Sequence, residues 1–254
     1  MIPETIQEIS HKYDIDENVV SEALYNLETG TRFITISGKI GAGKDTIAPL
    51  VLQSLNIPSE KTIQNSFAYY LKKEVQDIID ILRDNPSTTS FEISEQMNIL
   101  ETDAALVKEW LQETIFDPSL TSYSRTQNIR KTLQYWGTEV RRTQDPDYWA
   151  KKCLQLTYSY LAEGKSVYIT DVRFPNEADA VQDVYGKVIR LNVSPEVQES
   201  RIKQRDGLIV SDDARNHPSE TALDEYNSFN MSVNTDLFTP AEIVDQIVNS
   251  LVFD

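Results

Sequence analysis

A glycine-rich stretch near residue 40 has the spacing of a phosphate-binding loop. Residues 32–37 have the pattern of a short apolar strand, and Gly38–Lys44 follows with the spacing G-x-x-x-x-G-K. Glycines in such a loop allow positive φ and leave no Cβ between the backbone and a phosphate, so that successive N–H groups can point toward the anion. A helix that begins near Lys44 adds its positive dipole end, and the lysine can reach the phosphates. The residues that we expect to bind a nucleotide are Gly38, Gly41, Ala42, Gly43, Lys44, Asp45 and Thr46.

The residue after Lys44 departs from the usual pattern. Ser or Thr normally follows the lysine and binds magnesium, whereas this chain has Asp45 there and brings its hydroxyl one place later, at Thr46. Taken alone, the loop is a nucleotide site that lacks its usual magnesium ligand. The alternative is a glycine-rich turn that only joins a strand to a helix.

An aspartate and an arginine follow a second apolar run. Asp171 ends the strand expected at 166–171, and Arg173 comes two residues later. In proteins with such a loop, an aspartate at the tip of a neighbouring strand holds magnesium, often through water. The carboxyl edge of a parallel sheet is also where α/β proteins bind ligands, which makes Arg173 a candidate for phosphate binding. A helix cap is the alternative for Asp171.

The densest basic stretch of the chain lies at 129–142. Its Arg130, Gln134 and Arg141 fall near one face of an α-helix, at spacings of four and seven residues. A guanidinium binds phosphate through two parallel hydrogen bonds, and a glutamine amide can read the edge of a base. The alternative is a solvated face that pairs with nearby acidic residues.

Two further arginines, Arg201 and Arg205, lie four residues apart on the helix expected at 195–206. Such a pair could close over a donor triphosphate as a lid and stabilise charge during transfer. A surface helix in which Glu199 and Asp206 pair with these arginines is the alternative.

Composition narrows the class of protein. Lys and Arg number 24 against 40 Asp and Glu, a net charge of −16, which argues against duplex nucleic acid or an anionic membrane as a partner. No signal peptide and no apolar run of transmembrane length is visible, so we expect a cytoplasmic protein that binds small molecules. The single cysteine, Cys153, is expected in the core.

The sequence shows no cysteine–histidine cluster and no convincing Ser-His-Asp set. This suits phosphoryl transfer to a phosphate acceptor, because such an oxygen is already largely ionised at neutral pH, its second pKa being about 6. Positioning, magnesium and arginines then suffice for the reaction.

Strand and helix patterns alternate from residue 31 onward, which predicts an α/β fold with a parallel sheet covered on both faces. Strands are expected at 32–37, 62–66, 166–171, 187–193 and 228–233, and helices at 45–55, 67–83, 127–142, 146–163, 175–185, 195–206, 218–226 and 239–252.

Two segments stand apart from this alternation. The pattern of residues 3–28 predicts two short helices, which are too acidic to bind DNA. We expect them to serve packing or oligomerisation, and a homodimer is one such arrangement. Residues 84–126 contain two short acidic helices between loops, which we interpret as an insertion beside the acceptor site.

The chain resembles the deoxynucleoside monophosphate kinases of tailed bacteriophages, a branch of the P-loop nucleoside monophosphate kinases. Four pieces carry the likeness over about residues 31–254. They are Gly38–Thr46 with its Gly-Lys-Asp-Thr ending, Phe67-Ala68 with Leu71-Lys72, Leu133–Glu139 running to Asp147–Trp149, and Asp171–Ala180 with His217-Pro218-Ser219-Glu220 downstream.

The resemblance implies a three-layer P-loop kinase fold with a central parallel five-stranded sheet. A helical extension would occupy 1–30 and the kinase domain 31–254, in which 84–126 lies near the acceptor site and 194–216 is lid-like. The reaction implied is transfer of the γ-phosphoryl group of ATP to a deoxynucleoside 5′-monophosphate in the cytoplasm, which is the host's if the chain is phage-encoded. The rivals are another small-molecule kinase, similar to dephospho-CoA kinase, and a nucleotide-binding regulatory protein.

The resemblance also assigns roles to individual residues. Gly-Lys-Asp-Thr is a variant that this branch uses, so Asp45 and Asp171 would serve Mg²⁺ while the loop holds ATP. Together with the spacing arguments above, the candidates for catalysis are Lys44, Arg130, Arg173, Arg201 and Arg205. By resemblance, Arg130, Gln134 and Arg173 would bind the acceptor, and Phe67, Lys72 and Arg141 complete the candidate set for acceptor binding.

Overall fold

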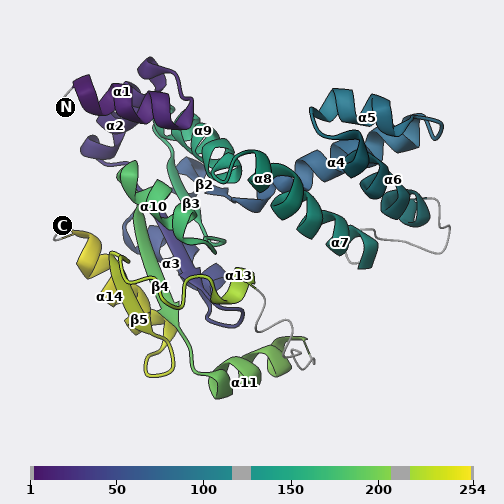
Figure 1. Cartoon of the computed structure of the whole chain (residues 1–254). Helices are drawn as coiled ribbons and strands as arrows, with labels where there is room; N and C mark the ends of the chain where they lie inside the picture. The colour runs from purple at the N-terminus through teal and green to yellow at the C-terminus, as the bar shows by residue number, and fades with distance from the viewer. Residues whose placement is uncertain (1–2, 116–126, 207–217, 253–254) are drawn as a thin grey trace. The chain divides into compact units, whose positions relative to one another are not determined.

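The computed structural model describes residues 3–115, 127–206 and 218–252 (Figure 1). The chain divides into two compact units. The sheet unit is formed by Met1–Phe67 with Ala150–Asp254, and the helical unit by Ala68–Trp149. The helical unit is thus wider than the insertion that we expected at 84–126.

Five parallel strands form the sheet, as the sequence predicted. They are β1 (Phe33–Gly38), β2 (Thr62–Asn65), β3 (Ser166–Ile169), β4 (Lys187–Asn192) and β5 (Met231–Asn234). Their order is β2-β3-β1-β4-β5, so β1 is central and has β3 and β4 as neighbours. This order brings the carboxyl ends of β1, β3 and β4 together at one edge.

Helices cover both faces of the sheet, because successive strand residues point to opposite sides. Phe33, Val167 and Val188 face a hydrophobic cluster that includes residues of α1 (Pro3–Tyr13), α2 (Glu17–Thr29), α9 (Tyr148–Ala162) and α10 (Pro175–Asp183). On the other face, Ile34, Ile36 and Ile189 pack with α3 (Lys44–Ser54) and α14 (Pro240–Val252). This α/β arrangement is compatible with a three-layer P-loop-like fold. The remaining elements of the unit are η1 (Ser59–Lys61), α11 (Pro195–Asp206) and α13 (Pro218–Thr221).

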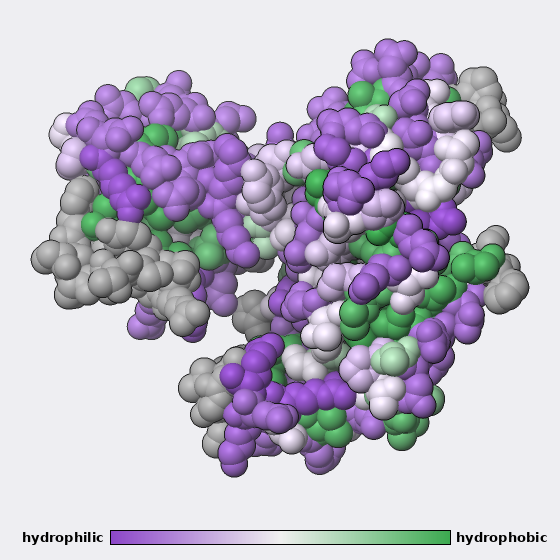
Figure 2. All heavy atoms as spheres, turned by 180° about the vertical axis from the view of Figure 1, so that it is seen from behind, coloured by the Kyte–Doolittle hydropathy of each residue, from purple (hydrophilic) through white to green (hydrophobic). Residues whose placement is uncertain are grey.

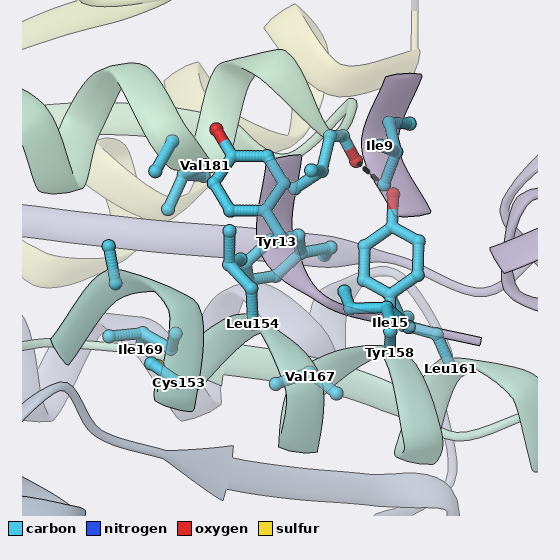
Figure 3. Packing of buried hydrophobic residues seen from close by; sticks show 14 of the residues in the cluster. Ile9, Tyr13, Ile15, Cys153, Leu154, Tyr158, Leu161, Val167, Ile169 and Val181 are labelled. Carbon is cyan, nitrogen blue, oxygen red and sulfur yellow. Dashed lines mark hydrogen bonds between the residues drawn. The ribbon is translucent and has the colours of Figure 1, made fainter. Parts of the chain in front are cut away.

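The two N-terminal helices are part of the core of the sheet unit. Ile9, Tyr13 and Ile15 lie among Leu154 and Tyr158 of α9 (Figure 3), and Tyr13 is only 2 % exposed. The Tyr13 hydroxyl donates a hydrogen bond to Asp183 (2.8 Å), and Asn26 donates to two carbonyls at the end of α9. Residues 3–29 therefore pack as a layer of this unit.

The helical unit contains α4 (Ala68–Asp84), α5 (Ser90–Met97), α6 (Glu101–Ile115), α7 (Gln127–Tyr135), a π-helical segment η3 (Trp136–Arg141) and α8 (Arg142–Gln144). Its own hydrophobic cluster includes Val75, Ile78, Leu111 and Trp136. The two short acidic helices expected within 84–126 are α5 and α6. The single regular helix expected at 127–142 is instead interrupted by η3.

The surface is largely hydrophilic on the face that Figure 2 draws, where hydrophobic side chains form smaller groups. Within the described ranges, no helix has the length and apolarity needed to span a bilayer.

The place of α1 in the core can be tested by truncating Tyr13. Tyr13→Ala should lower the free energy of unfolding by about 3–5 kcal/mol, as for other buried aromatic residues, because it leaves a cavity beside α9. Tyr25→Ala in α2 is the matched control; its side chain is 58 % exposed, and a change below about 1 kcal/mol is expected. Urea unfolding measures both, and equal losses would contradict the packing of α1.

Candidate functional site

The glycine-rich loop lies at the carboxyl edge of the central strand. Gly38 ends β1 and Lys44 begins α3, so the loop spans the edge between them. The ends of β3 and β4 lie on either side. In open α/β sheets, ligands bind in the crevice outside these strand ends.

Glycine is required at two points of the loop for different reasons. A Cβ on Gly38 would lie 2.9 Å from both the Ala42 Cβ and the carbonyl oxygen of Leu191 in β4. The end of β1 can therefore lie this close to the loop and to β4 only if residue 38 has no side chain. Gly43 has a φ of 90°, and a Cβ there would meet no atom within 4 Å. Its requirement is conformational, and the space above it is open.

Hydrogen-bond donors converge on that open space. Gly43 is the N-cap of α3 and offers no capping side chain. Among the described residues, the N–H groups of Gly43, Lys44 and Asp45 find no acceptor, whereas the Thr46 N–H bonds back to the Gly43 carbonyl (3.0 Å). The first turn of α3 therefore presents unsatisfied donors and the positive end of the helix dipole.

The Lys44 side chain adds a cation without a counter-ion. It is half-buried, and no ion pair or hydrogen bond of its ammonium occurs within the ranges that the structure describes. Burial lowers the pKa of the Lys44 ammonium, the Arg173 guanidinium lowers it further, and Asp45 and Glu220 partly offset both. An anion bound at the loop would relieve this cost.

Two carboxylates flank the loop on the β3 side. Asp45 accepts a hydrogen bond from the Thr170 hydroxyl (2.7 Å). Asp171, which follows Thr170 in the chain, accepts hydrogen bonds from the Ser66 hydroxyl (2.6 Å) and the Phe67 N–H (3.0 Å). Asp171 thus also fixes the backbone just before α4.

These oxygen donors fit a magnesium ion that is shared with a ligand. Mg²⁺ is commonly held by one or two carboxylates together with phosphates and waters. No group of three or more potential protein ligands occurs among the described residues. Asp45 and Asp171 supply ligands of the right kind, and the remaining positions would have to come from phosphate and water.

The predicted arginines of the sheet unit lie around the same loop. Arg173 donates to the Ser219 carbonyl (3.1 Å) and to Glu220. Arg201 donates to the Gly41 carbonyl (3.3 Å) and to the hydroxyl and carbonyl of Thr235 (2.9 and 2.8 Å), so it braces the loop against the end of β5. Arg205 is exposed and contributes to lowering the Lys44 pKa. Of the segment 194–216, which we expected to be lid-like, residues 207–216 lie outside the described residues.

The predicted acceptor residues of the helical unit separate into two groups. Lys72, Arg130 and Gln134 are exposed. Arg141 is buried instead, and its guanidinium donates to Glu74 (2.8 Å) and to the Met97 carbonyl (2.9 Å). The expected common face assumed a regular helix, but the π-helical segment changes the residue spacing per turn, so Arg141 faces the core.

Phe67 also proves to be a core residue. Its side chain is 4 % exposed and belongs to the main hydrophobic cluster of the sheet unit. We therefore leave Phe67 and Arg141 out of the candidate binding set.

Sequence reasoning assigned no role to two acidic residues near the loop, although Glu220 belongs to one of the segments that carry the resemblance. Glu220 accepts a hydrogen bond from the Ile40 N–H (2.9 Å), and Asp224 pairs with Lys39 (2.7 Å). Their four-residue spacing after His217-Pro218 was the available signal, but it resembled the first turns of an ordinary helix.

Neither a family model nor a curated protein matches this chain.

The unpaired charge of Lys44 yields a stability prediction. Lys44→Met should raise the free energy of unfolding by about 1 kcal/mol, because it removes a half-buried ammonium that lacks a counter-ion. The lowered pKa means that the unfolded state binds more protons, so this gain should shrink as the pH rises through the alkaline range.

Lys39→Met is the matched control for this measurement. Lys39 lies in the same loop but pairs with Asp224, so its loss should leave stability unchanged or lower it by up to about 1 kcal/mol. Urea unfolding at neutral pH compares the two variants. A Lys44→Met protein less stable than Lys39→Met would contradict the account of the site.

Proposed function

We propose that this chain is a kinase that transfers the γ-phosphoryl group of ATP to a deoxynucleoside 5′-monophosphate. The observation that supports this most is the group of unsatisfied amides beside the unpaired Lys44 ammonium, at the carboxyl edge of the central strand. Such a group favours a multiply charged anion, as a nucleotide triphosphate is.

The donor would bind along the loop and the first turn of α3. The N–H groups of Gly43, Lys44 and Asp45 would bind its phosphates, and the Lys44 ammonium would stabilise the charge that develops during transfer. Asp45 and Asp171 would hold Mg²⁺, which neutralises phosphate charge when it is bound. Arg201 would act on the donor through the loop carbonyl that it braces.

The acceptor would be a phosphate monoester, which needs no general base. Arg173 is the acceptor-phosphate residue that we propose from the sheet unit, because it shares an electrostatic environment with Lys44. Lys72, Arg130 and Gln134 of the helical unit remain predictions from the sequence.

The two alternative functions predict different results with ATP and an acceptor. A kinase similar to dephospho-CoA kinase would use the same loop with another acceptor. A regulatory protein would bind ATP without turnover, and the N-terminal helices that suggested it are accounted for by their packing in the core. A cytoplasmic location and a homodimer remain open predictions.

A panel of acceptors tests the proposed reaction. With ATP and Mg²⁺, at least one deoxynucleoside monophosphate should stimulate ADP release and give the matching diphosphate, identified by mass spectrometry. Lys44→Met should lower kcat by about 10²-fold or more. If dephospho-CoA alone is phosphorylated, the proposed acceptor class is wrong and the kinase similar to dephospho-CoA kinase is favoured. If ATP binds but no acceptor stimulates turnover, the regulatory protein is favoured.

A magnesium titration tests the role of Asp45. Asp45→Asn should raise the Mg²⁺ concentration for half-maximal turnover by about tenfold or more, because it removes one anionic ligand. Asp245→Asn, an exposed position on α14, makes the same change of charge and should have no effect. An unchanged titration for Asp45→Asn would remove Asp45 from the magnesium site.

A further inference from the structure

The segment that begins with α13 lies against the first half of the glycine-rich loop. Glu220 accepts a hydrogen bond from the Ile40 N–H (2.9 Å) through Oε2, while its Oε1 accepts from Nη1 of Arg173. The same Nη1 also donates to the Ser219 carbonyl (3.1 Å). Glu220 is largely buried, with 11 % of its side chain exposed. One carboxylate therefore joins the loop backbone to an arginine of the site.

A second contact holds this segment in place. Asp224 pairs with Lys39 (2.7 Å) and with Arg190 (3.4 Å), and Arg190 also donates to the Ser37 hydroxyl (3.0 Å). Between the two acidic residues, Leu223 is 3 % exposed and belongs to the core of the sheet unit. The position of Glu220 is thus supported by Leu223 and Asp224, which follow it in the chain.

The partner of Glu220 on the loop is not one of the unsatisfied donors. Ile40 lies in the first half of the loop, whereas the amides without acceptors belong to Gly43–Asp45. A bound phosphate would therefore not have to displace Glu220, and the carboxylate can keep its contacts while the site is filled.

The arginine also retains free donors. Glu220 and Ser219 bind only Nη1 of Arg173, and Nε and Nη2 donate to no acceptor in the described parts of the chain. A guanidinium has five N–H groups in a fixed fork, so fixing one edge orients the other. The negative charge of Glu220 also offsets the repulsion between Arg173 and Lys44, since it raises the Lys44 pKa that Arg173 lowers.

We propose that Glu220 is a positioning residue, which holds Arg173 and the first half of the loop so that the free edge of the guanidinium meets a substrate phosphate. This inference rests on the proposed function, in which Arg173 binds the acceptor phosphate. Glu220 itself touches no substrate and acts only through Arg173 and Ile40.

Glu220→Gln is the informative variant. The amide oxygen can still accept from the Ile40 N–H, but the charged partner of Arg173 is lost. We expect kcat to fall by at least about tenfold, the effect of losing one charge-assisted hydrogen bond, with the Kd for ATP changed by less than about threefold. Glu225→Gln removes an equal charge from an exposed side chain of the same segment and should leave the kinetics unchanged.

A double-mutant cycle separates positioning from general effects. If Glu220 acts through Arg173, the variant with both Glu220→Gln and Arg173→Ala should be no slower than Arg173→Ala alone. Additive losses, or a kcat for Glu220→Gln within twofold of the unchanged protein, would overturn the positioning role while leaving the kinase proposal intact.

A second readout does not depend on turnover. The Nη1–H resonance of Arg173, the group that Glu220 binds, should be protected from exchange in nuclear magnetic resonance spectra of the unchanged protein and of Glu225→Gln, and lost in Glu220→Gln. If the unchanged protein phosphorylates no acceptor, the proposed function fails, and this resonance still decides the positioning role. An Arg173 signal unaffected by Glu220→Gln would overturn it.

Discussion

A lysine ammonium that is half-buried without a counter-ion among the described residues is the constraint on which the candidate site depends. The chain could not hold Lys44 there at low cost unless other groups compensated, and Asp45 and Glu220 do so only in part. The first turn of α3 adds unsatisfied amides at the same place. In the free protein these donors lack acceptors and the ammonium lacks a counter-ion, so the site is suited to an anion that supplies both. Function is the physical reason to retain the loss of stability that this arrangement causes.

The sheet supplies the geometry that this site requires. Because β1 lies between β3 and β4, the loop, Asp171 and the start of α11 reach one edge although they are far apart in sequence. The parallel sheet was predictable because its strands are rich in β-branched residues and alternate with amphipathic helices. The turn between β1 and α3 was predictable because glycines at this spacing follow an apolar strand and precede a helical pattern, whereas its binding of phosphate stays a prediction.

Other features were not predictable, for physical reasons that differ. Periodicity cannot reveal a π-helical segment, so the spacing of Arg130, Gln134 and Arg141 suggested one face while the structure buries Arg141 beside Glu74. The packing of α1 depends on contacts with α9 across more than a hundred residues, which no local pattern contains. Glu220 was given no role because a glutamate in a first helical turn usually has a local explanation.

The central claim is that the loop amides and Lys44 receive the phosphates of a nucleotide. The most direct test is a titration with ATP and Mg²⁺ followed through the backbone amide resonances of a ¹⁵N-labelled protein. The amides of Gly43, Lys44 and Asp45 should shift strongly and saturate together, while those of Gly30 and Gly164, which also have positive φ but lie in other turns, should not move. Unchanged resonances for Gly43 and Lys44 at saturating ATP would contradict the account.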